Sequence, residues 1–200
     1  MTQSFRLGFG RILAALTLTL GLGGCGVNEV PRLDEAVKAA WSEVLNQYQR
    51  RSDLIPNLVE TVRGYAAQER DTLTAVTEAR AKATQTALPP DILTNPEAFK
   101  LFQQNQAALT SALSRLLAVS ERYPDLKSSQ NFLALQSQLE GTENRIAVAR
   151  RDYIGAVQRY NTNLRTIPGR WIAALLYPDA NIKETFTIAD SAQEAPKVRF

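Results

Sequence analysis

Apolar side chains recur every three or four residues from about residue 33 to residue 164, the spacing that places them on one face of an α-helix. Glycine is sparse in this stretch, and the two-residue alternation typical of a half-buried strand is almost absent. Segments rich in proline and turn-forming residues divide the pattern into four parts. We therefore predict helices over residues 33–51, 54–86, 96–122 and 129–165, joined by short connections.

Each predicted helix carries an apolar stripe that would face a common core. The small residues Thr142, Ala149 and Ala156 lie along the fourth stripe and permit close approach of a neighbouring helix. Four amphipathic helices with short loops predict an all-α fold, an antiparallel four-helix bundle with long helices, followed by a short helix and an extended tail. The predicted core positions are Leu33, Val37, Trp41, Val44, Tyr48, Ile55, Leu58, Val62, Tyr65, Leu73, Val76, Phe99, Phe102, Leu109, Leu113, Leu116, Val119, Phe132, Leu135, Leu139, Ile146, Tyr153 and Tyr160.

The boundary between the first two helices lies in the segment RRSDLIPNLV, which contains Pro56. Ser52 or Asp53 suits the N-cap of a new helix, with Pro56 in its first turn, where the missing N–H of proline leaves no bond unmade. The same residues also fit one long helix that is kinked at Pro56. We favour a break before residue 54 and keep the kinked helix as the alternative.

Two segments follow the bundle, which we place at residues 33–166. Residues 167–178 are short and apolar, with Trp171 and Tyr177 near opposite ends. We favour a helix here that caps the open end of the bundle; the alternative is a helix that contacts a membrane interface or a partner, since Trp and Tyr are common at such boundaries. Residues 179–200 are polar and are predicted to form an extended or poorly ordered tail.

Residues 1–24 have the pattern of a secretory signal peptide. Arg6 and Arg11 precede an uncharged, mostly apolar stretch at residues 12–22, which is shorter than the roughly 20 residues that a membrane-spanning helix needs. Small residues follow directly. We therefore expect this leader to be removed from the mature protein.

The only cysteine of the chain, Cys25, follows Leu22-Gly23-Gly24, and these four residues resemble the processing site of bacterial lipoproteins. In that resemblance Cys25 carries the lipid, and residues 25–32 form a short tether to the bundle. Two or three acyl chains anchor a protein stably, whereas one is marginal. An uncleaved membrane helix with an incidental cysteine is the alternative.

The composition argues against several classes of function. Removing Arg6 and Arg11 with the leader would leave 21 basic residues against 20 acidic ones, and this balance argues against a nucleic-acid-binding surface. The chain has no histidine, which removes the commonest general base and a common metal ligand. A lone cysteine offers no metal-ligand spacing, and no glycine-rich phosphate-binding motif is present. We therefore predict no enzymatic activity, no cofactor and no metal.

One polar set lies beside the predicted core. Glu143 and Arg150 are seven residues apart, hence on one helix face, and we expect Glu143 or Asp53 to pair with an arginine of a neighbouring helix, because an unpaired buried charge is costly. We favour an ion pair that fixes helix register; the alternative is part of a recognition groove. The full candidate set is Arg50, Arg51, Asp53, Asn57, Tyr65, Glu143, Arg150, Tyr153, Tyr160 and Asn161.

Three segments carry a family resemblance. The sequences AWSEVLNQYQRRSDLIPNLVETVRGYAAQE (residues 40–69), VSERYPDLKSSQNFLALQSQLEGTENRIAVARRDYIGAVQRYN (residues 119–161) and the ending PKVRF resemble the bacterial LemA family. The resemblance implies a helical bundle anchored near its N-terminus, mostly outside the cytoplasm, with no established enzymatic activity. Family members typically begin with a membrane-spanning helix, whereas the corresponding segment here ends in Cys25.

Together these features predict a lipid-anchored scaffold or adaptor on the extracytoplasmic side of the cell envelope, with another envelope protein as its partner. Because Gly26 rather than aspartate follows Cys25, the outer membrane is favoured over the inner one in a Gram-negative cell. The alternative is a periplasmic module that binds a small ligand or peptide between helices. The partner's identity and the oligomeric state stay open.

Overall fold

The computed structural model describes residues 26–85 and 88–187, and every regular element in these two ranges is a helix. The all-α fold predicted from the sequence is therefore confirmed. The predictions for the signal peptide at residues 1–24, for Cys25 and for residues 188–200 lie outside the described residues. The helices are α2 (Glu29–Tyr65), α3 (Arg70–Gln85), α4 (Pro96–Ser120), α5 (Pro124–Lys127), α6 (Gln130–Arg165) and α7 (Gly169–Leu176).

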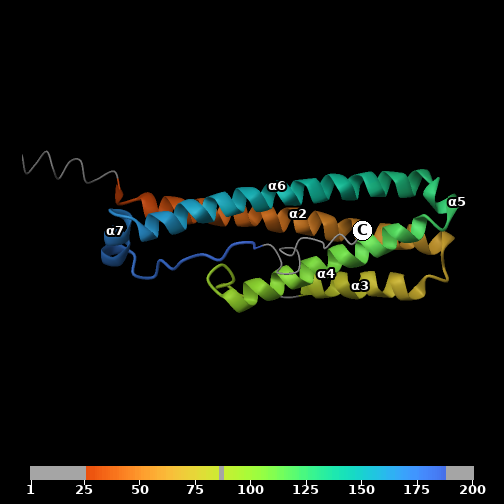
Figure 1. Ribbon diagram of the computed structural model, residues 1–200, viewed down its shortest axis with the longest axis horizontal. Helices are drawn as coiled ribbons and strands as arrows, with labels where there is room; N and C mark the ends of the chain where they lie inside the picture. Colours follow the sequence, from red (N-terminus) through yellow and green to blue (C-terminus); the bar gives the residue numbers. More distant parts are fainter. Residues whose placement is uncertain (1–25, 86–87, 188–200) are drawn as a thin grey trace, which may run out of the picture.

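The molecule is a rod built on two long helices, α2 and α6, which lie side by side along its length (Figure 1). They contain 37 and 36 residues, so each is about 55 Å long at 1.5 Å per residue. Helices α3 and α4 pack against each other and cover the half of the rod nearer α5. Helix α7 lies at the opposite end, beside the start of α2 (Figure 1).

Apolar side chains form two separate clusters along the rod. The cluster near α7 gathers around Trp41, and the cluster near α5 contains Leu58, Leu116 and Phe132. All the predicted stripe positions are buried except Leu135, which is partly buried, and Tyr65, which is 48% exposed. The small positions Thr142, Ala149 and Ala156 are also buried. The periodicity of the sequence therefore located the core nearly in full.

The predicted break before Pro56 is wrong, because α2 runs without interruption to Tyr65. In a regular helix the N–H of residue 56 would donate to the carbonyl of Ser52, and proline has no N–H. Here Arg80 of α3 supplies the missing donor, since its Nε lies 3.0 Å from that carbonyl and 3.2 Å from the Ser52 hydroxyl. Ser52 and Asp53 lie inside the helix and cap nothing.

The break falls instead at residues 66–69, so the predicted helix over residues 54–86 is also wrong. No proline or glycine occupies this turn. Its position is fixed by Glu69, whose carboxylate pairs with Arg122 at 2.9 Å and accepts a 2.9 Å hydrogen bond from the Tyr123 hydroxyl. The turn after α2 is thus held by residues of the α4–α5 connection, more than 50 residues later in the chain.

The third and fourth predicted helices correspond closely to α4 and α6. Asn95 caps α4 by accepting a 3.1 Å hydrogen bond from the N–H of Ala98, and Pro96 occupies the first turn, where its missing N–H removes no bond. The predicted short connection between these two helices, residues 123–128, contains the short helix α5.

One face of α7 packs on the bundle. Gly169 and Ala173 are buried, and a Cβ on Gly169 would lie 2.3 Å from the backbone oxygen of Asn163, so only glycine permits this close approach. Tyr177, predicted as a membrane or partner contact, is partly buried, and its hydroxyl donates to the carbonyl of Val27 at 3.1 Å. Trp171 lies on the other side and is 65% exposed. The helix therefore caps the rod with one face only.

The residues after α7 run back along the bundle as a segment that we name the strap, residues 178–187 (Figure 1). The strap has no helix or strand over residues 181–187, in line with the predicted extended tail. It is nonetheless packed in place, because Phe186 is buried in the cluster around Trp41, with its ring 5.2 Å from that of Phe99 and 5.5 Å from that of Tyr153. None of the helices among residues 26–85 and 88–187 combines the length and apolar character needed to cross a bilayer.

The contact between Arg80 and Ser52 leads to the first prediction. In Arg80→Met the buried carbonyl of Ser52 loses its donor, and we expect a loss of about 1–3 kcal/mol in the free energy of unfolding. In a Pro56→Ala background residue 56 regains an N–H that can donate to the Ser52 carbonyl. Arg80→Met should therefore lower the free energy of unfolding by less in this background than in the parent. Urea unfolding of the four proteins measures the difference; equal costs in both backgrounds would contradict the compensation.

Candidate functional site

A belt of polar side chains separates the two apolar clusters. We name it the polar belt, and its members lie within or beside the apolar stripes of their helices. The belt spans α2, α3, α4 and α6, and its members are Arg51, Ser52, Arg80, Gln106, Thr110 and Glu143.

Arg51 is the centre of the polar belt, and only 1% of its surface is exposed. Its Nη1 donates at 2.9 Å to the Thr110 hydroxyl of α4 and at 2.9 Å to a carboxylate oxygen of Glu143 of α6. Its Nη2 donates at 2.6 Å to the side-chain oxygen of Gln106. The guanidinium thus joins α2, α4 and α6 at one level of the rod.

The pairing of Glu143 with an arginine of a neighbouring helix, predicted from the sequence, is present. The Arg51 guanidinium also lies 5.1 Å from the centre of the Tyr48 ring, within the range of a cation–π contact. Burial raises the pKa of the Tyr48 hydroxyl above its ordinary value, so this ring stays neutral beside the cation. Both terminal nitrogens of the buried guanidinium thus have oxygen partners on neighbouring helices, which is a structural task.

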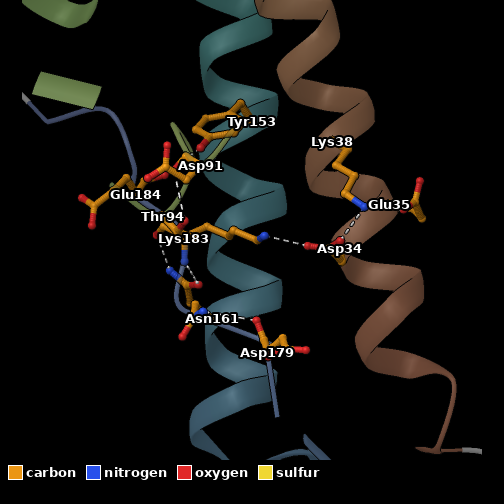
Figure 2. Close-up of polar contacts among 11 residues, drawn as sticks. Asp34, Glu35, Lys38, Asp91, Thr94, Tyr153, Asn161, Asp179, Lys183 and Glu184 are labelled. Atoms are coloured by element: carbon orange, nitrogen blue, oxygen red, sulfur yellow. Dashed lines mark hydrogen bonds and ion pairs between the residues drawn. The ribbon is translucent and has the colours of Figure 1, made fainter. Parts of the chain in front are cut away.

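A second polar set holds the strap, and Figure 2 shows its contacts. The Asn161 side chain makes two hydrogen bonds with the backbone of Lys183, donating to its carbonyl at 2.9 Å and accepting from its N–H at 2.9 Å. The Tyr153 hydroxyl donates to the carbonyl of Glu184 at 2.7 Å. The N–H of Glu184 donates in turn to the carbonyl of Leu93 at 2.7 Å. The backbone groups of residues 183 and 184 thus have hydrogen-bond partners although the strap belongs to no helix or sheet.

The Lys183 side chain completes this set by reaching α2 (Figure 2). Its Nζ lies 2.8 Å from Asp34, which also pairs with Lys38 at 2.9 Å. Partial burial works to raise the pKa of Asp34, but the hydrogen bonds from Lys183 and Lys38 together hold it below its ordinary value. Burial is also the main reason that the pKa of Tyr160 is raised to about 12. We name Asp34, Tyr153, Asn161 and Lys183 the latch.

The structure does not assemble the predicted recognition groove. Tyr153 and Asn161 bind the chain's own strap, Tyr160 is buried beside them, and the Arg150 guanidinium lies 4.4 Å from the centre of the Phe186 ring. The predicted set therefore splits between the polar belt and the strap contacts. The remaining candidates lie on the exposed surface of α2 and join neither group: Arg50, Asp53, Asn57 and Tyr65.

Among the hollows on the described part of the rod, two lie between helices. One, of about 220 Å³, lies between α2, α3 and α4 and is lined by Tyr48, Phe102 and Gln106, among others. The other, of about 360 Å³, lies between α7, the end of α6 and the strap. Within the two described ranges no three His, Cys, Asp or Glu side chains gather closely enough to hold a metal ion.

The polar belt generates the second prediction. Glu143→Gln keeps the shape of the side chain but removes the charge that faces Arg51, and we expect the free energy of unfolding to fall by about 1–2 kcal/mol. The loss stays modest because the Glu143 side chain is 38% exposed, so water screens the pair. Thermal unfolding should show a midpoint lower by a few degrees. Glu140→Gln is the control, since Glu140 is exposed on the same helix and should change stability by less than about 0.5 kcal/mol. Equal effects of the two substitutions would contradict a structural role for the pair.

The latch generates the third prediction, which concerns pH. The folded protein lowers the pKa of Asp34, so it binds this proton less tightly than the unfolded chain, and the resulting stability is present at neutral pH and lost as pH falls below about 4. Asp34→Asn should therefore be less stable than the parent at pH 7, with a difference that narrows between pH 5 and pH 3. Urea unfolding at each pH measures this difference.

Lys183→Met provides the matched background for that experiment. Without the ammonium group Asp34 loses its partner from the strap, so Asp34→Asn should cost less at pH 7 in this background. If the free energies of unfolding of the parent and Asp34→Asn differ by the same amount from pH 7 to pH 3, the lowered pKa of Asp34 does not contribute to stability and the prediction is wrong.

Comparison with known proteins finds a family match and several named relatives. Residues 40–200 match the LemA family. Magnetosome protein MamQ 2 of Paramagnetospirillum magneticum is 26% identical over 164 residues, covering 73% of this chain and 60% of the relative. Magnetosome protein MamQ of Magnetospirillum gryphiswaldense is 24% identical over 143 residues, covering 64% and 53% of the two chains. Protein LemA of Metamycoplasma hominis is 24% identical over 139 residues, covering 70% and 59%.

The chain thus spans less than two thirds of the length of these relatives. The family match nevertheless extends over most of α2 and over every later helix, and it includes the whole polar belt and the residues that hold the strap, apart from Asp34. On the extent of that match, the chain belongs to the LemA family.

Proposed function

We propose that this protein is held on the extracytoplasmic side of a bacterial membrane by a lipid on Cys25, and that it acts there as a non-enzymatic scaffold or adaptor for another envelope protein. One observation carries the proposal. The rod begins at the end where α7 lies, and the residue before its first described residue is the single cysteine of the chain (Figure 1).

The leader supports the anchor. Its basic start, its short apolar stretch and the Leu-Gly-Gly-Cys ending are the pattern of a processed lipoprotein. Gly26 after the cysteine favours the outer membrane where the cell has one. Relatives named magnetosome proteins support a role within a larger assembly.

The internal construction of the rod supports a scaffold. Helices about 55 Å long project well beyond a membrane surface, and a rod anchored at one end presents its far end and its sides to partners. Arg51 and Glu143 are used to join helices, and Tyr153 and Asn161 are used to hold the strap. These four side chains, all close to the core, thus have partners within the chain.

A module that binds a small ligand or peptide between helices is the second candidate. The hollow of about 220 Å³ lined by Tyr48, Phe102 and Gln106 favours it. Ordinary ligand pockets measure roughly 300–1,000 Å³, so this hollow is small for a metabolite. The scaffold therefore remains the preferred function.

The fourth prediction tests anchor and scaffold together. Cells that express the full chain with a photo-crosslinking amino acid at Val148, which is 45% exposed on α6, are fed a traceable fatty acid. We expect the chain to carry the label, to fractionate with membranes, and to capture one discrete envelope protein on illumination. In Cys25→Ala the label should be lost, since no other cysteine can accept the lipid.

The same chain with the crosslinker at Glu140, which is exposed and polar on the same helix, reports non-specific capture. Label that persists in Cys25→Ala would contradict lipidation at this site. An unlabelled parent chain recovered from the cytosol would contradict the whole proposal, and identical capture from both crosslinker positions would contradict a specific adaptor.

A further inference from the structure

The outward side of α7 is unusually apolar for a surface. Trp171 and Leu175 are spaced by four residues, which places them on one side of the helix, and they are 65% and 80% exposed. Ile167, in the turn just before the helix, is 62% exposed. Leu176, the last residue of the helix, is 49% exposed. The opposite side is fixed to the bundle through Gly169 and Ala173. We name Ile167, Trp171, Leu175 and Leu176 the apolar patch.

Helix α7, which carries the apolar patch, lies beside the first described residues of the chain. A Cβ added to Gly26 would meet the Ile172 side chain of α7 at 3.2 Å, and the hydroxyl of Tyr177 donates to the carbonyl of Val27 at 3.1 Å. Cys25 is bonded directly to Gly26, and residues 1–24 with their apolar stretch precede it. A membrane that holds Cys25 through a lipid would therefore also lie close to α7.

Two arginines lie near the start of this helix, Arg165 as the last residue of α6 and Arg170 as the second residue of α7. Arg165 and Arg170 line the hollow of about 360 Å³ between α7, α6 and the strap, together with apolar atoms of Ala174 and Tyr177. Both are exposed, and among the described residues neither has a carboxylate partner. A guanidinium without a partner suits a phosphate group, to which it can donate two parallel hydrogen bonds.

We propose that α7 lies on the membrane surface, with the apolar patch in the interfacial layer and with Arg165 and Arg170 on the phosphate headgroups of anionic phospholipids. The inference deepens the proposed function and rests on it, because the tether at Cys25 is what brings α7 to the bilayer. Tryptophan with aliphatic residues on one side of a helix and basic residues beside them is the composition of interfacial membrane helices.

A second copy of the chain fits this surface less well. A symmetric pair would place the same patch on both sides of the contact and would bring Arg165 and Arg170 of one copy towards those of the other. Like charges at close range oppose such a contact, whereas an anionic bilayer attracts them. The rod would then stand with its membrane-contacting end fixed at two points, the lipid and α7.

The fifth prediction uses the full lipidated chain, purified from membranes and reconstituted into vesicles of phosphatidylcholine and phosphatidylglycerol. The chain has two tryptophans, and Trp41 is only 7% exposed, so the emission of the parent minus that of Trp171→Phe reports on Trp171. We expect Trp171 to be quenched by brominated phospholipids and protected from iodide in the water phase. Leu175→Glu should abolish that quenching.

Two further variants sharpen the result. Leu133→Glu is the matched control, since Leu133 is 50% exposed at the start of α6 near the other end of the rod, and it should leave the quenching unchanged. Each of Arg165→Gln and Arg170→Gln should lower the ratio of inserted to water-exposed Trp171 about fivefold on anionic vesicles, and not on pure phosphatidylcholine. Circular dichroism verifies that every variant is folded.

The outcomes separate the inference from the function on which it rests. A chain on vesicles whose Trp171 stays open to iodide and unquenched by bromolipid overturns the inference alone. Protection from iodide without bromolipid quenching means that a protein covers the patch, and this also overturns it. A chain that does not stay on vesicles and carries no fatty acid overturns the tether and the inference together.

Discussion

The rod depends on one requirement, that the buried guanidinium of Arg51 must find partners. It lies where the two apolar clusters meet, and its hydrogen bonds reach α4 and α6 at the same level. Apolar stripes alone tolerate a shift of one helix along another, since leucine and valine pack in several registers. A shift of one turn would leave the guanidinium without oxygen partners, at a cost of several kcal/mol. The polar belt therefore selects one alignment of the long helices.

The same logic explains why α2 passes through Pro56. A proline inside a helix leaves one carbonyl without a donor, and here a neighbouring helix provides it through Arg80. Local preference indicated a break at that point, and the structure places the break where Glu69 meets Arg122 and Tyr123. The periodic stripes could be read from the chain because each is local. The end of α2 could not, because it is fixed by residues that follow more than 50 positions later.

The candidate site shows the same division. The sequence indicated that Glu143 would need an arginine, since a charge beside an apolar stripe requires a partner, and Arg51 is that partner. It also singled out Tyr153 and Asn161, but their partners are backbone groups of residues 183 and 184, in a polar segment without periodicity. Asp34 and Lys183 were missed for that reason. The available signal was Phe186, a large aromatic side chain within an otherwise polar tail.

Phe186 has a consequence for the order of folding. The rings of Trp41, Phe99 and Tyr153 lie against it, so the cluster near α7 lacks one of its core rings until residue 186 of 200 has been synthesised. The cluster near α5 uses residues 55–139 alone and needs nothing from the C-terminal segment. During synthesis the half of the rod near α5 can consequently mature first, while the half near α7 stays unfinished until most of the chain has been made.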